Sequence, residues 1–167
     1  MLSTLRAFGE WLATTSLSET IQNVSWIIPT VQTIHILCVA IVISASFLVD
    51  LRILGIFSRS QPLAALSHRF LTWIWWALIV LLVTGSLLII GEPQRSLLNP
   101  AFFAKMIMLV IVASLTAVLQ RPLAANAGYW ESSGGRVVTA KGIAVVSLVL
   151  WSCIVFAGRW IAYVTAL

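Results

Sequence analysis

Hydrophobic residues occur in long runs along this chain, and polar residues gather between the runs. The first run without a charged residue extends from Thr20 to Val49 and is mainly apolar from Ile27 onward. A helix needs about 20 apolar residues to cross the hydrocarbon core of a bilayer. Four long apolar runs, two of them without a charged residue and two with a single one, predict spans over residues 27–49, 70–91, 101–120 and 142–165. The expected fold class is an all-α integral membrane protein, a four-transmembrane-helix up-down bundle.

Polar residues and prolines indicate where these helices begin and end. Asn99-Pro100 is typical of a helix start, because asparagine caps the helix and proline suits its first turn. Ser60 with Pro62 predicts a start for the second helix at about residue 62. Arg121-Pro122 is expected to end the third span, and the polar stretch 123–141 is expected to form the longest loop.

Residues 1–26 differ from the rest because their apolar positions are spaced as on one face of a helix. Leu2, Leu5, Phe8 and Leu12 share this face, and polar residues occupy another. Such a pattern favours an amphipathic helix that lies in the membrane interface. The alternative is a short solvated tail. We therefore divide the chain into an interfacial helix over residues 1–26 and a single transmembrane domain over residues 27–167.

Composition supports the membrane class and narrows the possible partners. Of the 167 residues, 60% are hydrophobic and 9% are charged, against about 25% charged in an average soluble domain. The net charge of +5 comes from ten Lys and Arg against five Asp and Glu. In a membrane protein such an excess reflects topology, so the expected partners are the lipid bilayer and other membrane subunits or further copies of the chain. No nucleic-acid partner is expected.

Basic residues predict the orientation of the four spans. The loops after the first and third spans carry Arg52, Arg59, Arg69, Arg121, Arg136 and Lys141. The opposite side carries Arg6 and Arg95. Cytoplasmic loops of membrane proteins are enriched in lysine and arginine. Both termini are therefore expected outside, in the periplasm of a Gram-negative host.

Candidate chemistry centres on His35 in the first span. The expected topology places further polar residues at a similar depth below the outer surface, namely Gln32, Thr84, Ser86, Lys105 and Arg159, with Glu92 at the rim. Cations inside a membrane are costly and usually have a partner or a use. This group could hold haem b or a quinone, with His35 as an iron ligand, Met106 or Met108 as a sixth ligand, and the two cations as anion anchors.

Each of these residues also has a purely structural interpretation. His35 could be a packing residue that hydrogen-bonds a facing serine, threonine or carbonyl group. Lys105 and Arg159 lie near span ends and could extend to water along their own stems. His68 is expected at the opposite edge of the membrane, which excludes the two histidines as axial ligands of one haem.

The two cysteines and the charges at the inner boundary are interpreted as structural. Cys38 lies one turn from His35, but two ligands make only half a metal site, so we expect Cys38 and Cys153 in the core. At the inner boundary, Asp50 is expected to pair with Arg52, Arg69 or Arg121. Such an ion pair would fix the first helix against its neighbours and is interpreted as a latch rather than a proton path.

Several segments together resemble a known group of proteins. They are the single-histidine first span, the block Val49-Asp50-Leu51-Arg52-Ile53-Leu54-Gly55, the tryptophan-rich second span and the Asn99-Pro100-Ala101-Phe102 start of the third. The chain is similar in these features to an uncharacterised bacterial family of small four-helix inner-membrane proteins. The resemblance implies a bacterial inner-membrane location and four spans, and it brings no established activity. Size and layout also resemble four-helix b-type cytochromes and copper-resistance membrane proteins, but the several haem-binding histidines of the former are missing.

No sequence signature of an enzyme is present. The chain has no Ser/His/Asp arrangement, no glycine-rich phosphate loop and no His-Glu-x-x-His motif. Two hypotheses follow. In the first, the protein is a non-catalytic accessory or scaffold subunit of a larger membrane complex. In the alternative, it is a haem b or quinone-binding electron-transfer module that uses His35, with Lys105 and Arg159 as anion anchors.

Overall fold

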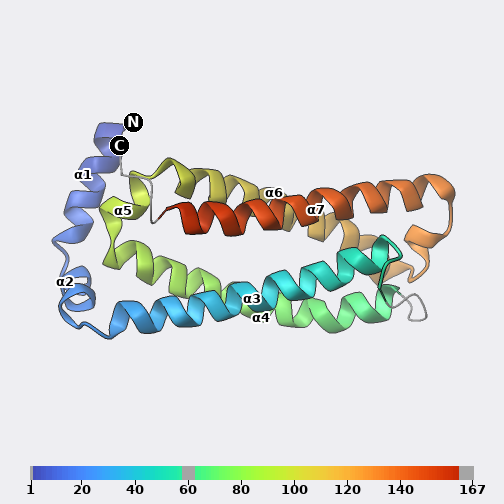
Figure 1. The fold of residues 1–167 in the computed structure, drawn as a ribbon, viewed down its shortest axis with the longest axis horizontal. Helices are drawn as coiled ribbons and strands as arrows, with labels where there is room; N and C mark the ends of the chain where they lie inside the picture. Colours follow the sequence, from blue (N-terminus) through green and yellow to red (C-terminus); the bar gives the residue numbers. More distant parts are fainter. Residues whose placement is uncertain (1, 58–62, 162–167) are drawn as a thin grey trace.

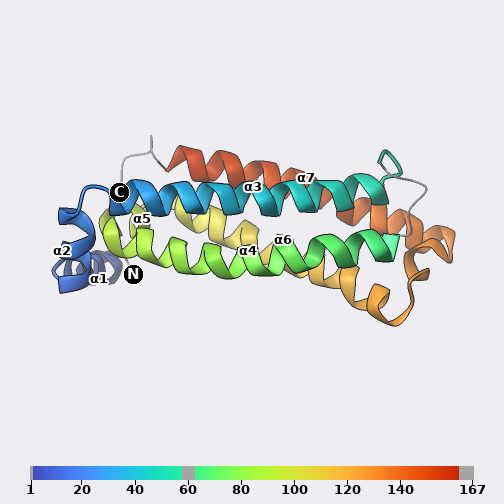
Figure 2. The same cartoon turned by 90° about the horizontal axis from the view of Figure 1, so that it is seen from below.

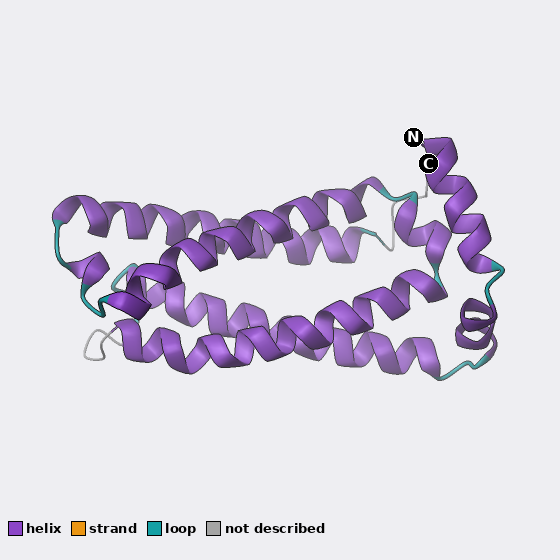
Figure 3. Cartoon of the chain, turned by 180° about the vertical axis from the view of Figure 1, so that it is seen from behind, coloured by secondary structure: helices purple, strands orange, loops and turns teal. Residues whose placement is uncertain are grey.

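The computed structural model describes residues 2–57 and 63–161 of the chain. Every regular element within these residues is helical (Figures 1 and 3). In chain order the elements are α1 (Leu2–Ala13), α2 (Ser16–Asn23), α3 (Ile27–Ile53), α4 (Leu63–Gly91), α5 (Pro93–Leu97), α6 (Pro100–Ala125), the 3-10 helix η1 (Tyr129–Glu131) and α7 (Gly134–Trp160). The all-α fold class predicted from the sequence is confirmed.

Four of these helices, α3, α4, α6 and α7, are long and apolar enough to cross a membrane. Each of them extends beyond its apolar run at one end or both. A helix does not have to end where the hydrocarbon ends, because its backbone groups bond within the helix on either side of the boundary. The predicted start at Ser60 and Pro62 and the predicted end of the fourth span at residue 165 lie outside the described residues.

Two boundaries predicted from the sequence are wrong. Pro122 does not end the third span, since α6 continues to Ala125. The polar stretch 123–141 is not one long loop, because Ser133 accepts a hydrogen bond from the backbone N–H of Arg136 at 3.4 Å and caps α7 there. The polar residues after that cap are therefore part of α7. Only a short connection that contains η1 remains between α6 and α7.

Residues 2–23 form two helices separated by a Thr-containing break. The break lies at Thr14 and Thr15, and Thr15 caps α2 by accepting a hydrogen bond from the backbone N–H of Ser18. Helix α1 packs against α5, and α2 packs against α4. Figures 1 and 2 show α1, α2 and α5 together at one end of the bundle. Trp11 is 60% exposed on α1, and an interfacial position of this segment stays a prediction.

The four long helices form two antiparallel hairpins. Helix α3 packs mainly against α4, and α6 packs mainly against α7. The two hairpins meet chiefly along α3 and α7, whereas α4 and α6 make few contacts. The central core lies where all four helices meet, and its buried residues are Val42, Ala45, Ile74, Ala77, Val112, Trp151 and Ile154. This arrangement gives the bundle a seam between α3 and α7.

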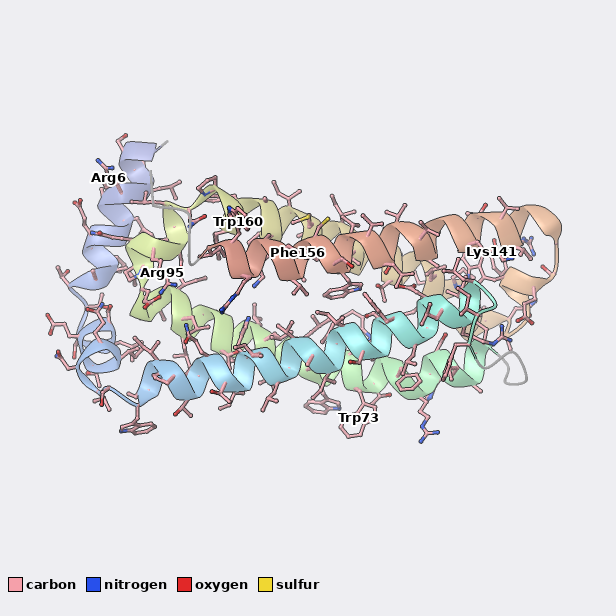
Figure 4. All side chains as sticks on the ribbon, viewed as in Figure 1. Arg6, Trp73, Arg95, Lys141, Phe156 and Trp160 are labelled. Carbon is pink, nitrogen blue, oxygen red and sulfur yellow. The ribbon has the colours of Figure 1, made fainter. Side chains whose placement is uncertain are left out.

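Most of the apolar surface of the spans faces outward. Between 11% and 28% of the most apolar window of each span is buried within the chain. Figure 4 shows the side chain of Trp73 directed away from the bundle, and Trp73 is 63% exposed. The same view places Arg6 and Arg95 at one end and Lys141 at the other. An outer surface of this kind suits lipid or partner helices.

Candidate ligand site at His35

His35 is fixed by a hydrogen bond to the neighbouring span. Its Nδ1 lies 2.8 Å from Oγ1 of Thr84, which joins α3 to α4. The hydroxyl of Thr84 also lies 2.7 Å from the backbone carbonyl of Val80 one turn earlier in α4. A hydroxyl has a single hydrogen to donate, and the carbonyl can only accept. His35 therefore donates its Nδ1–H to Thr84, and Thr84 donates to Val80.

This pattern determines which imidazole nitrogen is available for chemistry. When Nδ1 carries the proton of a neutral histidine, Nε2 keeps its lone pair. No hydrogen bond to Nε2 is formed within the described residues. A histidine whose Nδ1–H is oriented by a neighbouring oxygen is the usual arrangement for a metal or proton-accepting imidazole. His35 is thus partly buried, oriented by its neighbour, and open at Nε2.

The His35 ring packs against the opposing helix at Gly85. A Cβ added at Gly85 would lie 3.5 Å from Cε1 of His35, which is an ordinary van der Waals distance. The imidazole therefore rests against α4 between Thr84 and Gly85.

Lys105 reaches the same region from the other hairpin. Its Nζ would lie 3.6 Å from a Cβ added at Gly158. The lysine side chain therefore packs against α7 at a position where that helix has no side chain. Lys105 lies close enough to His35 for their charges to interact. No hydrogen bond or ion pair of the Lys105 ammonium is found within the described residues. All four spans therefore contribute to one site, through His35, Thr84, Gly85, Lys105 and Gly158.

The remaining residues of the expected group are placed differently. Gln32 and Arg159 are exposed on the surface of the bundle. Met108 packs against the central core, and Met106 is 41% exposed. Among the described residues no three His, Cys, Asp or Glu side chains gather in a group that could hold a metal ion. The anchoring roles of Gln32, Met108 and Arg159 therefore stay predictions.

The cysteine interpretation holds for one residue only. Cys38 is partly buried and packs against the central core. Cys153 is exposed, so its expected place in the core is wrong. Its neighbour Ile154 points inward instead. Both residues are apolar enough for either position, and only the packing of α7 decides between them.

The expected ion pair of Asp50 is absent from the described structure. Arg52 instead pairs with Glu131 of η1 at 3.3 Å, and the other ion pair among the described residues joins Glu92 to Arg95. Asp50 accepts a hydrogen bond from the side chain of Ser147 in α7. Arg69 and Arg121 are exposed. The arginines extend toward water, where a charge costs least, and leave the carboxylate inside the bundle.

Sequence reasoning placed Thr84 at the right depth but missed the glycines beside His35 and Lys105, and Ser147 beside Asp50. A small residue in an apolar helix gives no signal of which neighbour it will face. A polar residue such as Ser147 shows only that a partner is needed. These contacts depend on how the helices are rotated about their axes.

The fold and the site together define the class of protein. This is a multi-pass membrane protein with four α-helical spans and a histidine-centred polar site between them. The chain belongs to a family of unknown function (DUF6644), whose family model matches residues 8–164. No curated protein and no solved structure matches the chain.

Proposed function

We propose that the His35 site binds the polar end of a redox cofactor with an apolar body, either a quinone head group or haem b. The observation that carries this proposal is the pair formed by Nε2 of His35 and the ammonium of Lys105. Both lie between the helices, and neither has a hydrogen-bond partner in the described part of the chain. A cation held in a membrane bundle without a carboxylate calls for an anionic or strongly polar ligand.

The two groups offer complementary chemistry to one ligand. The ammonium of Lys105 donates hydrogen bonds and attracts an oxygen that carries negative charge. Nε2 of His35 accepts a hydrogen bond or binds iron. A quinol hydroxyl would donate to Nε2 while its second oxygen accepts from Lys105. Haem b would bind through its iron to Nε2 and through a propionate to Lys105.

The experiment compares the purified wild-type protein with three variants, two at histidines and one at Lys105. The protein is extracted in mild detergent after expression with added haem, and a reduced-minus-oxidised visible spectrum is recorded. Quinones that copurify are extracted and quantified by chromatography. His35→Ala tests the site, Lys105→Met tests the anion anchor, and His68→Ala is the matched control because His68 is exposed at the other end of α4.

The outcomes separate the two ligands and can overturn the proposal. A haem spectrum that is lost in His35→Ala and kept in His68→Ala assigns haem b. A quinone that copurifies with the wild type and is depleted in both His35→Ala and Lys105→Met assigns a quinone. Folded wild-type protein that carries neither ligand would overturn the proposal.

A second candidate function is that of a non-catalytic subunit in a larger membrane assembly. It is favoured by the tryptophans of α4, since Trp73, Trp75 and Trp76 are 63%, 52% and 66% exposed. Large aromatic side chains are enriched where helices meet partners. In native gels of detergent-solubilised membranes, the chain is then expected in a species well above its own 18.3 kDa. Trp73→Ala with Trp76→Ala is expected to release it, and a wild-type monomer in its own membrane would contradict this role.

The membrane proposed for the protein is the bacterial inner membrane, with both termini in the periplasm. The support is the distribution of basic residues between the two ends of the bundle, where Lys141 lies opposite Arg6 and Arg95 (Figure 4). The end with more lysine and arginine faces the cytoplasm in most membrane proteins. The His35 site then lies nearer the periplasmic side.

A further inference from the structure

A cavity with several polar lining residues lies between the helices, near the end opposite the His35 site. Its volume is about 30 Å³. All four spans line it, and its polar lining residues are Ser46, Asp50, Ser67, Thr116, Gln120 and Ser147. Trp130 of η1 closes the lining on the side of the connection between α6 and α7. This cavity is separate from the site proposed to hold a cofactor.

Four buried polar atoms on the residues that line this cavity have no hydrogen-bond partner in the described part of the chain. They are Oδ2 of Asp50, Oγ of Ser46, Oγ of Ser67 and Nε2 of Gln120. Asp50 is only 3% exposed, and its other contact is the hydrogen bond from Ser147. A buried polar group without a partner costs roughly 1–3 kcal/mol, so four around one cavity indicate a ligand.

Water fits this set of atoms better than a metal ion does. The carboxylate oxygen only accepts hydrogen bonds, the amide nitrogen of Gln120 only donates them, and the serine hydroxyls do both. A metal ion cannot accept from an N–H group, whereas water donates and accepts. One water needs roughly 10–15 Å³ of such space, so the cavity has room for about two. Waters placed there would offer hydrogen bonds to these atoms and would hydrate the carboxylate.

Among the described residues that line this cavity, Asp50 has no charged neighbour. The lining side chains from α4, α6, α7 and η1 are all uncharged, and none of them titrates near neutral pH: Ser67, Ile74, Thr116, Leu119, Gln120, Leu123, Ser147 and Trp130. From α3 the lining adds Ser46, Val49 and Ile53. Arg52, the nearest arginine in sequence, pairs with Glu131. A carboxylate inside a membrane bundle is costly without a counter-ion, and binding a proton removes that cost.

We propose that Asp50 and the water in this cavity form an internal proton-binding site. In the binding step, a hydronium ion in the cavity transfers its proton to Oδ2 of Asp50. One O–H bond forms on the carboxyl group, one O–H bond of the hydronium breaks, and a water molecule remains in the cavity. Ser147 continues to donate to the carboxyl group and holds it in place.

The connection between α6 and α7 forms a cover over this site. Nε1 of Trp130 donates a hydrogen bond of 2.8 Å to the backbone carbonyl of Leu119 in α6. Glu131 next to it is held by Arg52 of α3. The cover therefore ties two spans together above the carboxyl group and limits the exchange of cavity water with the outside.

Infrared spectroscopy of the purified full-length protein tests the proposal directly. A protonated carboxyl group has a carbonyl stretching band that a carboxylate lacks. Spectra are recorded over a pH series in H2O and in D2O, for the wild type, Asp50→Asn and the control Glu10→Gln, which changes an exposed carboxyl group of α1. The band is expected in the wild type and in Glu10→Gln, and it should be missing in Asp50→Asn. It should weaken as pH rises and shift to lower frequency in D2O.

Three results would overturn the proposal. They are a folded wild type without the band at any pH, a band that persists in Asp50→Asn, and a band that D2O does not shift, which would show a dry cavity. If Asp50→Asn does not fold, Ser147→Ala replaces it and is expected to move the pH at which the band disappears. A band suppressed by sodium but not by choline would assign the cavity to a metal cation, which would also overturn the proposal.

Discussion

A single hydroxyl determines what His35 can do. Thr84 accepts a hydrogen bond from the Nδ1–H of the imidazole and donates one from its hydroxyl to a helix carbonyl. Without this acceptor the ring would turn about its side-chain torsion, and either nitrogen could carry the proton. The open Nε2 is therefore a property of the pair His35 and Thr84 and not of the histidine alone.

Replacing Thr84 by valine tests this pair. The variant keeps the shape of the side chain but leaves Nδ1 of His35 unsatisfied, so the free energy of unfolding is expected to fall by about 1–2 kcal/mol. Thr84→Ser, which keeps the hydroxyl, is the control. Denaturant titrations in detergent measure the change, and nitrogen NMR of labelled histidine reports the tautomer. Equal stability and an unchanged tautomer in Thr84→Val would contradict the assignment.

The sequence allowed the depth of each polar residue to be predicted but not its direction. Depth follows from counting 1.5 Å per residue along a helix, which is why His35, Thr84 and Lys105 were expected at one level. Direction depends on the rotation of each helix. Residues on all sides of these helices are apolar, so hydrophobicity does not distinguish the packed face from the lipid face. Cys153 and Ile154 show this, because one is exposed and the other buried.

Among the elements, the small helices at the His35 end control how the spans are joined. Helix α2 lies against the end of α4, where Oγ of Ser18 donates a hydrogen bond of 2.7 Å to the carbonyl of Ile90. A Cβ added at Gly91 would lie 2.8 Å from Cγ2 of Ile21, which is closer than such atoms approach. This contact requires glycine.

Gly91→Ala is therefore expected to push α2 away from α4. Overpacking of this kind typically costs about 1–3 kcal/mol of unfolding free energy. The matched control is Gly142→Ala in α7, where an added Cβ would meet nothing within 4 Å. That control should be neutral or gain up to about 1 kcal/mol, because alanine favours helix over glycine. The melting temperatures of the two variants are measured by thermal unfolding in the same detergent. Equal melting temperatures for Gly91→Ala and Gly142→Ala would contradict the close contact at Gly91.

The start of α6 is also tied to the end of α7. The side chain of Asn99, which is fully buried, accepts a hydrogen bond from the backbone N–H of Ala101 and donates one of 3.2 Å to the carbonyl of Ile161. Sequence analysis predicted the cap from Asn99-Pro100. The second bond could not be predicted, since it joins residues that are distant along the chain.

Substitutions at Asn99 separate these two bonds. Asn99→Ala removes both and is expected to cost about 1–2 kcal/mol of unfolding free energy. Asn99→Ser keeps a side-chain oxygen that can cap α6 but loses the amide donor to Ile161, so its stability should lie between those of the wild type and the alanine variant. Denaturant titrations measure both variants. A serine variant as unstable as the alanine variant would show that the cap contributes little.

At the scale of the whole molecule, the number of spans was predicted correctly and their pairing was not addressed. Four apolar runs are sufficient to predict four helices, because each must satisfy its backbone within the bilayer. Which helices pack together depends on side-chain fit between nearly uniform apolar surfaces. The polar connection was predicted as a long loop because polar residues were taken to mark the end of a helix, whereas α7 begins directly after Ser133.

The orientation of the whole molecule is testable with reporter fusions. A reporter placed at Gly134 is expected to behave as cytoplasmic, and one placed before α1 as periplasmic, because the Gly134 end carries more basic residues. Alkaline phosphatase and green fluorescent protein fusions give opposite readouts of the two compartments. The reverse pattern would place the His35 site on the cytoplasmic side.

The seam between α3 and α7 is the line along which one hairpin can tilt against the other. Each hairpin is a rigid arm, because its two helices pack along their length, whereas the arms themselves meet mainly along this one line. His35 and Thr84 belong to one arm, and Lys105 and Gly158 belong to the other. The Asp50 cavity is divided between the same two arms at the far end of the seam. A tilt of one arm against the other would therefore change both sites in the same movement.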